Sequence, residues 1–159
     1  MSSRLLIPLL LAGAVALACN SRSHSDATVS PSANTTRHAM TKHAKGTPIS
    51  TQFNVRADQK AIDFALHLTN ATKKGIELEF PSGQEYDFTV VDSTGREVYR
   101  WAAGRMFTQA LQNRQLDGGE TMRFEERAET SLPSGRYVAE ATLRSTNYPV
   151  KERYEFVLQ

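Results

Sequence analysis

The feature of this sequence that most constrains its fold is a two-residue alternation of apolar and polar side chains, repeated in short runs. In the central run, Tyr86, Phe88 and Val90 are separated by Asp87 and Thr89. Successive side chains of a β-strand point to opposite faces of a sheet, so this run has one apolar face and one polar face. It therefore predicts a strand that packs one face against a core.

A turn and a second apolar run follow directly. Residues 92–95 read Asp-Ser-Thr-Gly, in which the Asp carboxylate can accept hydrogen bonds from nearby backbone and the Gly can adopt a positive φ. Residues 96–101 then contribute Val98, Tyr99 and Trp101. Two runs joined by such a turn predict a β-hairpin, which we expect to form the middle of an antiparallel sandwich.

Runs of the same kind recur along the rest of the chain. They lie at residues 53–55, 62–69, 76–80, 122–127, 137–143 and 154–158. Seven or eight short strands separated by turn residues, without a sustained helical period, predict an all-β antiparallel sandwich. Residues 106–111 fit either a short helical turn or a strand edge, and the spacing of Phe107 and Leu111 favours the helical turn.

The start of the chain has the pattern of an export signal. Arg4 is followed by an apolar stretch at residues 5–17, too short to span a bilayer, and by small residues before Cys19. Residues 1–18 resemble a bacterial lipoprotein signal peptide, which implies that Cys19 is the lipid attachment site. The alternative is an ordinary secretory signal in which Cys19 is incidental. We expect an exported, membrane-anchored lipoprotein, at the outer membrane or periplasmic face in a Gram-negative cell.

Residues 19–50 are predicted to be the lipidated cysteine and a disordered, flexible tether. They are rich in Ser, Thr, Asn, Ala, His and Lys and contain few large apolar side chains that could offset the entropy cost of ordering. His24, His38 and His43 are irregularly spaced, which favours solvated side chains over metal ligands. Residues 51–159 are then the globular domain.

Composition excludes several classes of function. Residues 51–159 contain 14 Lys and Arg against 16 Asp and Glu, a net charge of −2, so the domain lacks the cationic surplus of a nucleic-acid-binding domain. The single cysteine leaves neither a disulfide framework nor a cysteine zinc site. We expect no cofactor and no metal.

Catalytic chemistry also finds little support in the sequence. The one histidine after the tether, His67, follows Asp63 by four residues, and such positions on one strand are about 13 Å apart, too far for an acid–base pair. Glu125 and Glu126 are interpreted as charges on a solvated face. Nucleophile elbows, phosphate loops and metalloprotease helices have no match. We expect neither an enzyme nor a small-molecule substrate.

Several short motifs resemble one known family. They are Ser-Gly-Gln-Glu-Tyr-Asp-Phe at residues 82–88, Glu-Val-Tyr-Arg-Trp at 97–101, Phe-Thr-Gln-Ala-Leu at 107–111, Gly-Glu at 119–120 and Pro-Ser-Gly-Arg-Tyr at 133–137. Together they are similar to the BsuPI family, the intracellular proteinase inhibitor domain. The resemblance implies an immunoglobulin-like sandwich and inhibition of a subtilisin-type serine protease.

The export signal and the resemblance together suggest a lipid-anchored, non-catalytic protein-binding module of the bacterial cell envelope. Its expected partner is a protein, with an extracytoplasmic serine protease as the candidate. The candidate binding loop is at residues 102–119, with Arg105, Met106 and Phe107 as anchors. The alternative is a structural or assembly module of the envelope without inhibitory activity.

Overall fold

The computed structural model describes residues 46–159, and these form nine β-strands and no helix. The predicted signal peptide, Cys19 and nearly all of the predicted tether lie outside the described residues. The strands are β1 (Ile49–Ala57), β2 (Ala61–Asn70), β3 (Ile76–Phe80), β4 (Tyr86–Asp92), β5 (Glu97–Arg100), β6 (Gln112–Leu116), β7 (Thr121–Glu129), β8 (Gly135–Leu143) and β9 (Val150–Leu158). The predicted all-β class is confirmed, with nine strands where seven or eight are expected.

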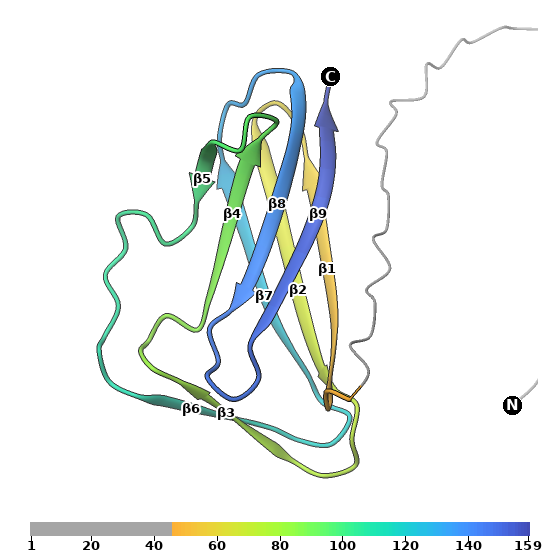
Figure 1. The fold of residues 1–159 in the computed structure, drawn as a ribbon, viewed down its shortest axis with the longest axis vertical. Coiled ribbons are helices and arrows are strands. Elements are labelled where there is room, and N and C mark those ends of the chain that lie inside the picture. Colours follow the sequence, from red (N-terminus) through yellow and green to blue (C-terminus); the bar gives the residue numbers. More distant parts are fainter. Residues whose placement is uncertain (1–45) are drawn as a thin grey trace, which may run out of the picture. The chain divides into compact units, whose positions relative to one another are not determined.

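The strands form two facing sheets and a separate pair, and every pairing is antiparallel. One sheet has the order β1-β2-β7, and the other has the order β5-β4-β8-β9. The pair β3-β6 lies across one end of the sandwich (Figure 1). This is the antiparallel sandwich that the alternating runs predict.

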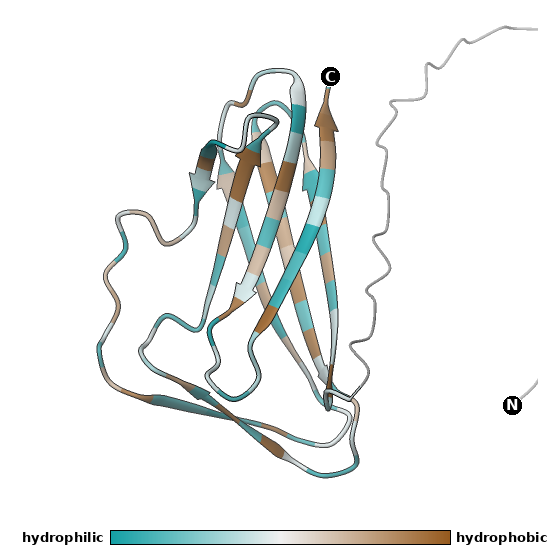
Figure 2. Ribbon diagram, in the orientation of Figure 1, coloured by the Kyte–Doolittle hydropathy of each residue, from teal (hydrophilic) through white to brown (hydrophobic). Residues whose placement is uncertain are grey.

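The core lies between the two larger sheets and is filled mainly by alternate residues of β1, β2, β4, β7, β8 and β9, whose hydropathy alternates along the ribbon (Figure 2). Phe53 and Phe64 of one sheet stack on Phe88 of the other, with ring centroids 5.9 and 5.0 Å apart. Leu66 and Val90 are fully buried beside them. A fully buried side chain of this size contributes roughly 1.5–3 kcal/mol, so the alternation accounts for much of the driving force for folding.

The predicted hairpin forms, but only one of its strands lies inside a sheet. A single Asp92 carboxylate oxygen accepts hydrogen bonds from the Thr94 amide and hydroxyl and from the Arg96 amide, and Gly95 has φ of +82°. β4 pairs with β5 and β8, whereas the four-residue β5 is an edge strand. The expectation that the whole hairpin occupies the middle of the sandwich is therefore wrong for β5.

The strand that the sequence analysis did not predict is β6. Its sequence, Gln-Asn-Arg-Gln-Leu, has one buried side chain, that of Leu116, so it lacks an apolar alternation. It is a strand because it pairs with β3, which buries Leu78 and Phe80. Residues 106–111 form neither the helical turn nor the strand edge considered above.

Two asparagine side chains attach the β3-β6 pair to the sandwich. Buried Asn70 donates to the Lys74 and Leu116 carbonyls at 2.8 and 3.0 Å. Asn147, between β8 and β9, accepts from the Glu79 amide and donates to the Glu77 carbonyl. These bonds satisfy backbone groups that a separate pair of strands would leave unpaired.

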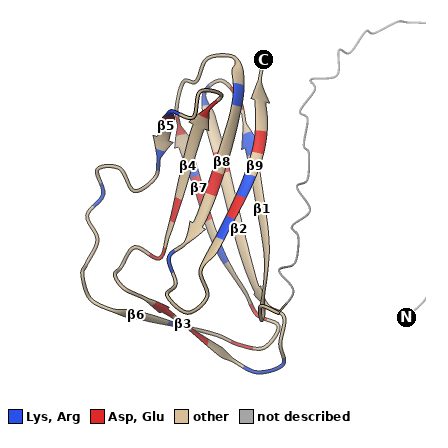
Figure 3. Ribbon diagram, in the orientation of Figure 1, with Lys and Arg blue, Asp and Glu red and all other residues tan. Residues whose placement is uncertain are grey.

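Residues of both charge signs are distributed along the strands (Figure 3). On the face formed by β8 and β9, Lys151 and Arg153 lie 3.0 and 3.2 Å from the two carboxylate oxygens of Glu140. Exposed pairs of this kind contribute little to stability, typically below about 1 kcal/mol each.

Candidate functional site

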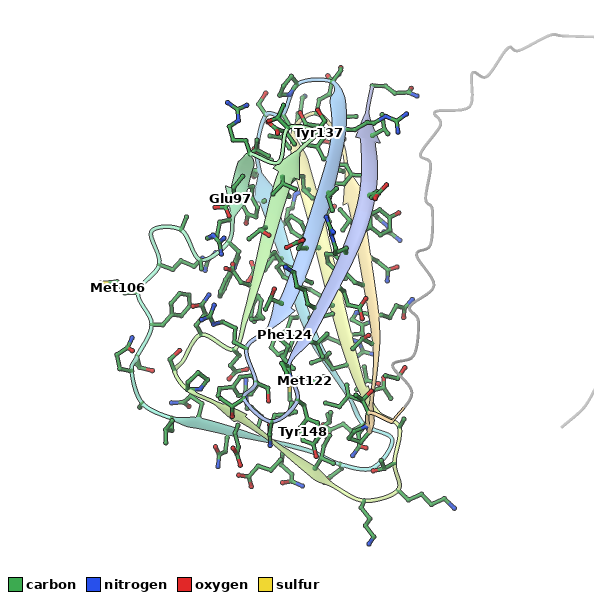
Figure 4. All side chains as sticks on the ribbon, in the orientation of Figure 1. Glu97, Met106, Met122, Phe124, Tyr137 and Tyr148 are labelled. Carbon is green, nitrogen blue, oxygen red and sulfur yellow. The ribbon has the colours of Figure 1, made fainter. Side chains whose placement is uncertain are left out.

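The segment between β5 and β6, residues 101–111, carries the most exposed large apolar side chains of the part of the chain that the structure describes. It projects from the β5 edge of the sandwich (Figure 1), and Met106 points away from the sheets (Figure 4). The side chains of Met106 and Leu111 are 98% and 80% exposed. We call residues 101–111 the projecting loop. It covers the first part of the 102–119 loop predicted from the sequence, since residues 112–116 form β6.

The base of the projecting loop is held by a buried carboxylate, that of Asp87 on β4. Its Oδ2 atom accepts from Nη1 of Arg100 at 2.6 Å, and its Oδ1 atom accepts from the Ala102 amide at 3.1 Å. Asp87 is 3% exposed, although alternation places it on the polar face of β4. The chain leaving β5 folds over that face, so Asp87 fixes the direction in which the loop departs.

Trp101 is the platform on which both neighbours of Met106 rest. The guanidinium carbon of Arg105 lies 4.4 Å from the centroid of the Trp101 ring, and Nε of Arg105 donates to the Trp101 carbonyl at 2.9 Å. Phe107 follows Met106 in the sequence, and the centroid of its ring lies 5.5 Å from that of the Trp101 ring. Arg105 and Phe107 are therefore anchored, while Met106 between them is not.

The Trp101 platform is connected to both sheets through Tyr86. The Tyr86 ring stacks on Trp101 at 4.3 Å and contacts Phe124 of β7 at 4.6 Å. Its hydroxyl donates to Glu126 Oε1. Burial, and then the hydrogen bond to Glu126, raise the pKa of the Tyr86 hydroxyl above its usual value. The platform thus has a fixed position relative to the core.

Glu126 is a site residue that the sequence analysis misplaced. The sequence assigns it with Glu125 to a solvated face, but its side chain is partly buried and its carboxylate accepts a hydrogen bond from the Tyr86 hydroxyl. The spacing in β7 contained the signal, because position 126 has the same parity as Met122, Phe124 and Ala128, which face the core. Inward-facing charge on the end strand of a sheet also discourages pairing with other chains.

The outgoing half of the projecting loop is fixed by a glycine. The Gly83 amide donates to the Thr108 carbonyl at 2.9 Å. A Cβ atom at position 83 would lie 2.7 Å from Oγ1 of Thr108, closer than such atoms approach. Further along, Arg114 of β6 pairs with Glu85 at 2.9 Å. Residues 82–88, 97–101 and 107–111, three of the quoted motifs, therefore meet around this loop.

The backbone at the tip of the projecting loop is available for intermolecular pairing. Neither the amide nor the carbonyl of Met106 has a hydrogen bond within residues 46–159. A segment with unpaired backbone groups can pair with an extended strand of a partner, while its side chains enter pockets. The three predicted anchors thus have different roles: Arg105 and Phe107 hold the loop, and Met106 is presented.

The remaining polar side chains of residues 46–159 form charged pairs rather than a second candidate site. His67 Nε2 lies 3.2 Å from Glu125 Oε1, and Asp63 pairs with Arg127 at 2.8 Å. These side chains line part of a pocket of about 580 Å³ along β1, β2 and β7. Within residues 46–159, no three His, Cys, Asp or Glu side chains gather as metal ligands would. No helix of this part of the chain has the length and apolar character of a membrane span.

Several solved structures are similar to this chain. The β-glucosidase EmGH1 from Erythrobacter marinus matches at 16% identity and a TM-score of 0.36, over 69% of this chain and 16% of that chain. A Bacteroides uniformis β-glucuronidase matches at 18% identity and a TM-score of 0.39, over 69% and 12%. The sporulation control protein Spo0M from Bacillus subtilis matches at 8% identity and a TM-score of 0.45, over 71% and 50%. The chain spans less than a fifth of each glycosidase and half of Spo0M. No curated protein matches it.

A family model matches residues 49–148, well over half of the sequence, and is described as the intracellular proteinase inhibitor BsuPI. This description corrects the predicted localisation. An exported, membrane-anchored lipoprotein conflicts with a family of intracellular inhibitors, so that expectation is wrong. The expectation of export rests on residues 1–19, which lie outside both the family match and the described residues. The lipidation of Cys19 stays an untested prediction. The matched segment contains all the residues of the projecting loop and its supports, and the chain belongs to the BsuPI family of intracellular proteinase inhibitors.

Proposed function

We propose that this protein inhibits a subtilisin-type serine protease by inserting the projecting loop into the active-site cleft of the protease. The observation that carries the proposal is the arrangement at the tip, where the exposed Met106 lies between two anchored neighbours. Membership of an inhibitor family supports a protease as the partner.

The physical requirement on an inhibitory loop is that little freedom is lost when the protease binds it. Ordering a side chain at an interface costs about 0.5–1.5 kcal/mol, and a loop that is ordered beforehand avoids much of this cost. Here Arg105 and Phe107 already rest on Trp101, and the backbone on either side is held by Asp87 and Gly83. These parts of the loop are therefore already held in the free protein, before the protease binds.

The rest of the interface would come from the surface around the loop. A tight inhibitor complex buries about 1,600 Å² in total, more than one loop of this length supplies. The edge strand β5 and the turn that contains Gly83 lie beside the loop and share its anchors. We expect these segments to border the contact and the remote strand β9 to lie outside it.

Inhibition is tested by titrating the full-length protein against subtilisin with a chromogenic peptide substrate. We expect protease activity to fall to a plateau near zero, with an inhibition constant of micromolar or lower. The double variant Arg105→Ala/Phe107→Ala should weaken inhibition by at least about tenfold, equivalent to about 1.4 kcal/mol, because it frees the loop. Val157→Ala, which also trims an exposed apolar side chain but on β9, is the matched control and should inhibit like the unmodified protein.

Full protease activity at about 10 µM inhibitor would contradict the proposal, since that concentration exceeds the expected inhibition constant. That result would favour the alternative considered from the sequence, a structural or assembly module without inhibitory activity. Equal weakening by Val157→Ala and by the loop variant would show that inhibition does not depend on the projecting loop.

A further inference from the structure

We infer that Met106 is the side chain that enters the S1 pocket of the protease, the pocket that receives the residue before the scissile bond. This inference rests on the proposed function. It assigns the specificity of the inhibitor to one residue, and it selects proteases whose S1 pocket is deep and apolar over those that recognise Arg or Lys.

The contacts of Arg105 disfavour it for this role. Its guanidinium group lies over the Trp101 ring at 4.4 Å, and its Nε atom donates to the Trp101 carbonyl at 2.9 Å. To enter an S1 pocket, the side chain would have to leave both partners. A protease with an Asp at the base of its S1 pocket would therefore meet a guanidinium that is already engaged.

The other apolar side chains of the loop are poorer candidates. Phe107 is half-buried against Trp101, so removing it would expose part of the platform. Leu111 is exposed, but it directly precedes β6, where Gln112 pairs with Phe80 of β3. A substrate-like segment pairs with the protease through its backbone on both sides of the inserted residue, which favours Met106, since the residues directly after Leu111 are already paired with β3.

The chemistry of the Met106 side chain fits an apolar slot. It is unbranched and has a polarisable thioether, so it can adjust to an irregular apolar pocket. Its 98% exposure means that the free protein leaves this apolar surface in water, where burial by a protease yields a favourable free energy. In a pocket built for a cation, the same side chain would leave the pocket carboxylate unpaired.

The test is a change of specificity measured with the full-length protein against chymotrypsin, subtilisin and trypsin. Met106→Lys should lose inhibition of the two proteases with apolar S1 pockets by about 100-fold or more and gain inhibition of trypsin. Met106→Leu should stay within a few-fold of the unmodified protein. Leu111→Lys is the matched control, because it adds the same charge to the same loop, and it should not gain inhibition of trypsin.

Oxidation by a peroxide gives a second readout. The thioether sulfur takes one oxygen atom from hydrogen peroxide and is oxidised by two electrons to the sulfoxide, while the peroxide is reduced to water. A polar sulfoxide does not suit an apolar pocket, so the treated protein should lose inhibition by about tenfold or more, with unchanged unfolding temperature. Met106→Leu should resist the treatment, which separates Met106 from the half-buried Met122 of β7.

The outcomes distinguish the inference from the proposed function. If the unmodified protein inhibits and Met106→Lys behaves like Leu111→Lys, Met106 does not enter the S1 pocket, while inhibition by the loop stands. If neither the unmodified protein nor Met106→Lys inhibits any of the three proteases, the proposed function fails, and the inference fails with it.

Discussion

The two connections at the ends of β5 differ in which residues hold them in place. The turn between β4 and β5 is satisfied by its own residues, because Asp92 accepts three hydrogen bonds from Thr94 and Arg96 and Gly95 adopts a positive φ. The projecting loop on the other side has internal contacts to Trp101, but its position is set by residues outside it, namely Asp87, Tyr86 and Gly83. One connection needs no tertiary structure, and the other depends on it.

This difference has a functional meaning. The β4–β5 turn uses the Asp92 carboxylate for its own backbone and presents no large apolar side chain, so we assign it the role of joining two strands. A loop whose base is held by other parts of the fold can leave the residue at its tip without contacts. Met106 is such a residue, because its side chain is exposed and its backbone amide and carbonyl are unpaired within residues 46–159. The comparison predicts that variants of the turn change stability alone, whereas variants of the loop supports change stability and inhibition together.

The largest effect is expected for Trp101→Ala. It removes a ring that is 8% exposed and contacts Tyr86 and Phe107, so we expect a loss of about 3–5 kcal/mol in the free energy of unfolding, measured with urea, together with loss of inhibition. Trp101→Phe keeps much of the platform and removes an indole Nε1 that is buried without a hydrogen-bond partner among the described residues. It should cost much less than Trp101→Ala. Equal costs for the two variants would contradict the platform role.

A smaller loss is expected for Asp87→Asn, which removes the charge at the base of the loop and keeps the shape of the side chain. In the variant, Arg100 would donate to an uncharged amide oxygen instead of a carboxylate. We expect a loss of about 1–3 kcal/mol in the free energy of unfolding. Inhibition should weaken as well, because the Ala102 amide loses its charged acceptor. Unchanged inhibition at a clearly lower urea midpoint would place Asp87 among residues that serve the fold alone.

Alanine substitutions at Gly95 and Gly83 are expected to have opposite effects on stability and inhibition. Gly95→Ala places a Cβ atom at φ of +82° with no neighbour nearby, so it should cost about 1 kcal/mol of stability and leave inhibition intact. Gly83→Ala places a Cβ atom 2.7 Å from Oγ1 of Thr108 and 3.5 Å from its amide nitrogen, so Thr108 and the loop around it must shift; inhibition should fall, while the stability cost should be smaller. Parallel thermal-unfolding and inhibition measurements check both, and a reversed pattern would break the comparison.

The smallest effect concerns acid pH and the self-satisfied turn. Hydrogen bonds, first that of the Thr94 hydroxyl, lower the pKa of Asp92 below its usual value of 3.8. A pKa that is lowered in the folded state stabilises the protein at pH values above the usual pKa. This stabilisation is lost as the pH falls through the folded-state pKa. Asp92→Asn should therefore reduce the fall in unfolding temperature between about pH 5 and pH 2. An identical fall in the variant would show that Asp92 contributes nothing to acid sensitivity.

Much of the fold could be predicted because its determinants are local in sequence. The alternation at residues 62–69 and 86–90 gave β2 and β4 directly, and the Asx-Gly turn gave the hairpin. β6 could not be predicted because a polar run with one buried leucine has no period, and only pairing with β3 makes it a strand. The candidate loop was identified by its length, which did not reveal that β6 ends it.

The sequence alone determined which residues face the core and where the chain turns, because alternation and turn chemistry act over a few residues. The tertiary structure decided the site. Glu126 is 40 residues from Tyr86 along the chain, and Asp87 is 15 residues from the Ala102 amide. No short-range pattern encodes such distances, since they depend on how the sheets stack. For the same reason, only the folded protein distinguishes the two anchored side chains, Arg105 and Phe107, from the one that is presented, Met106.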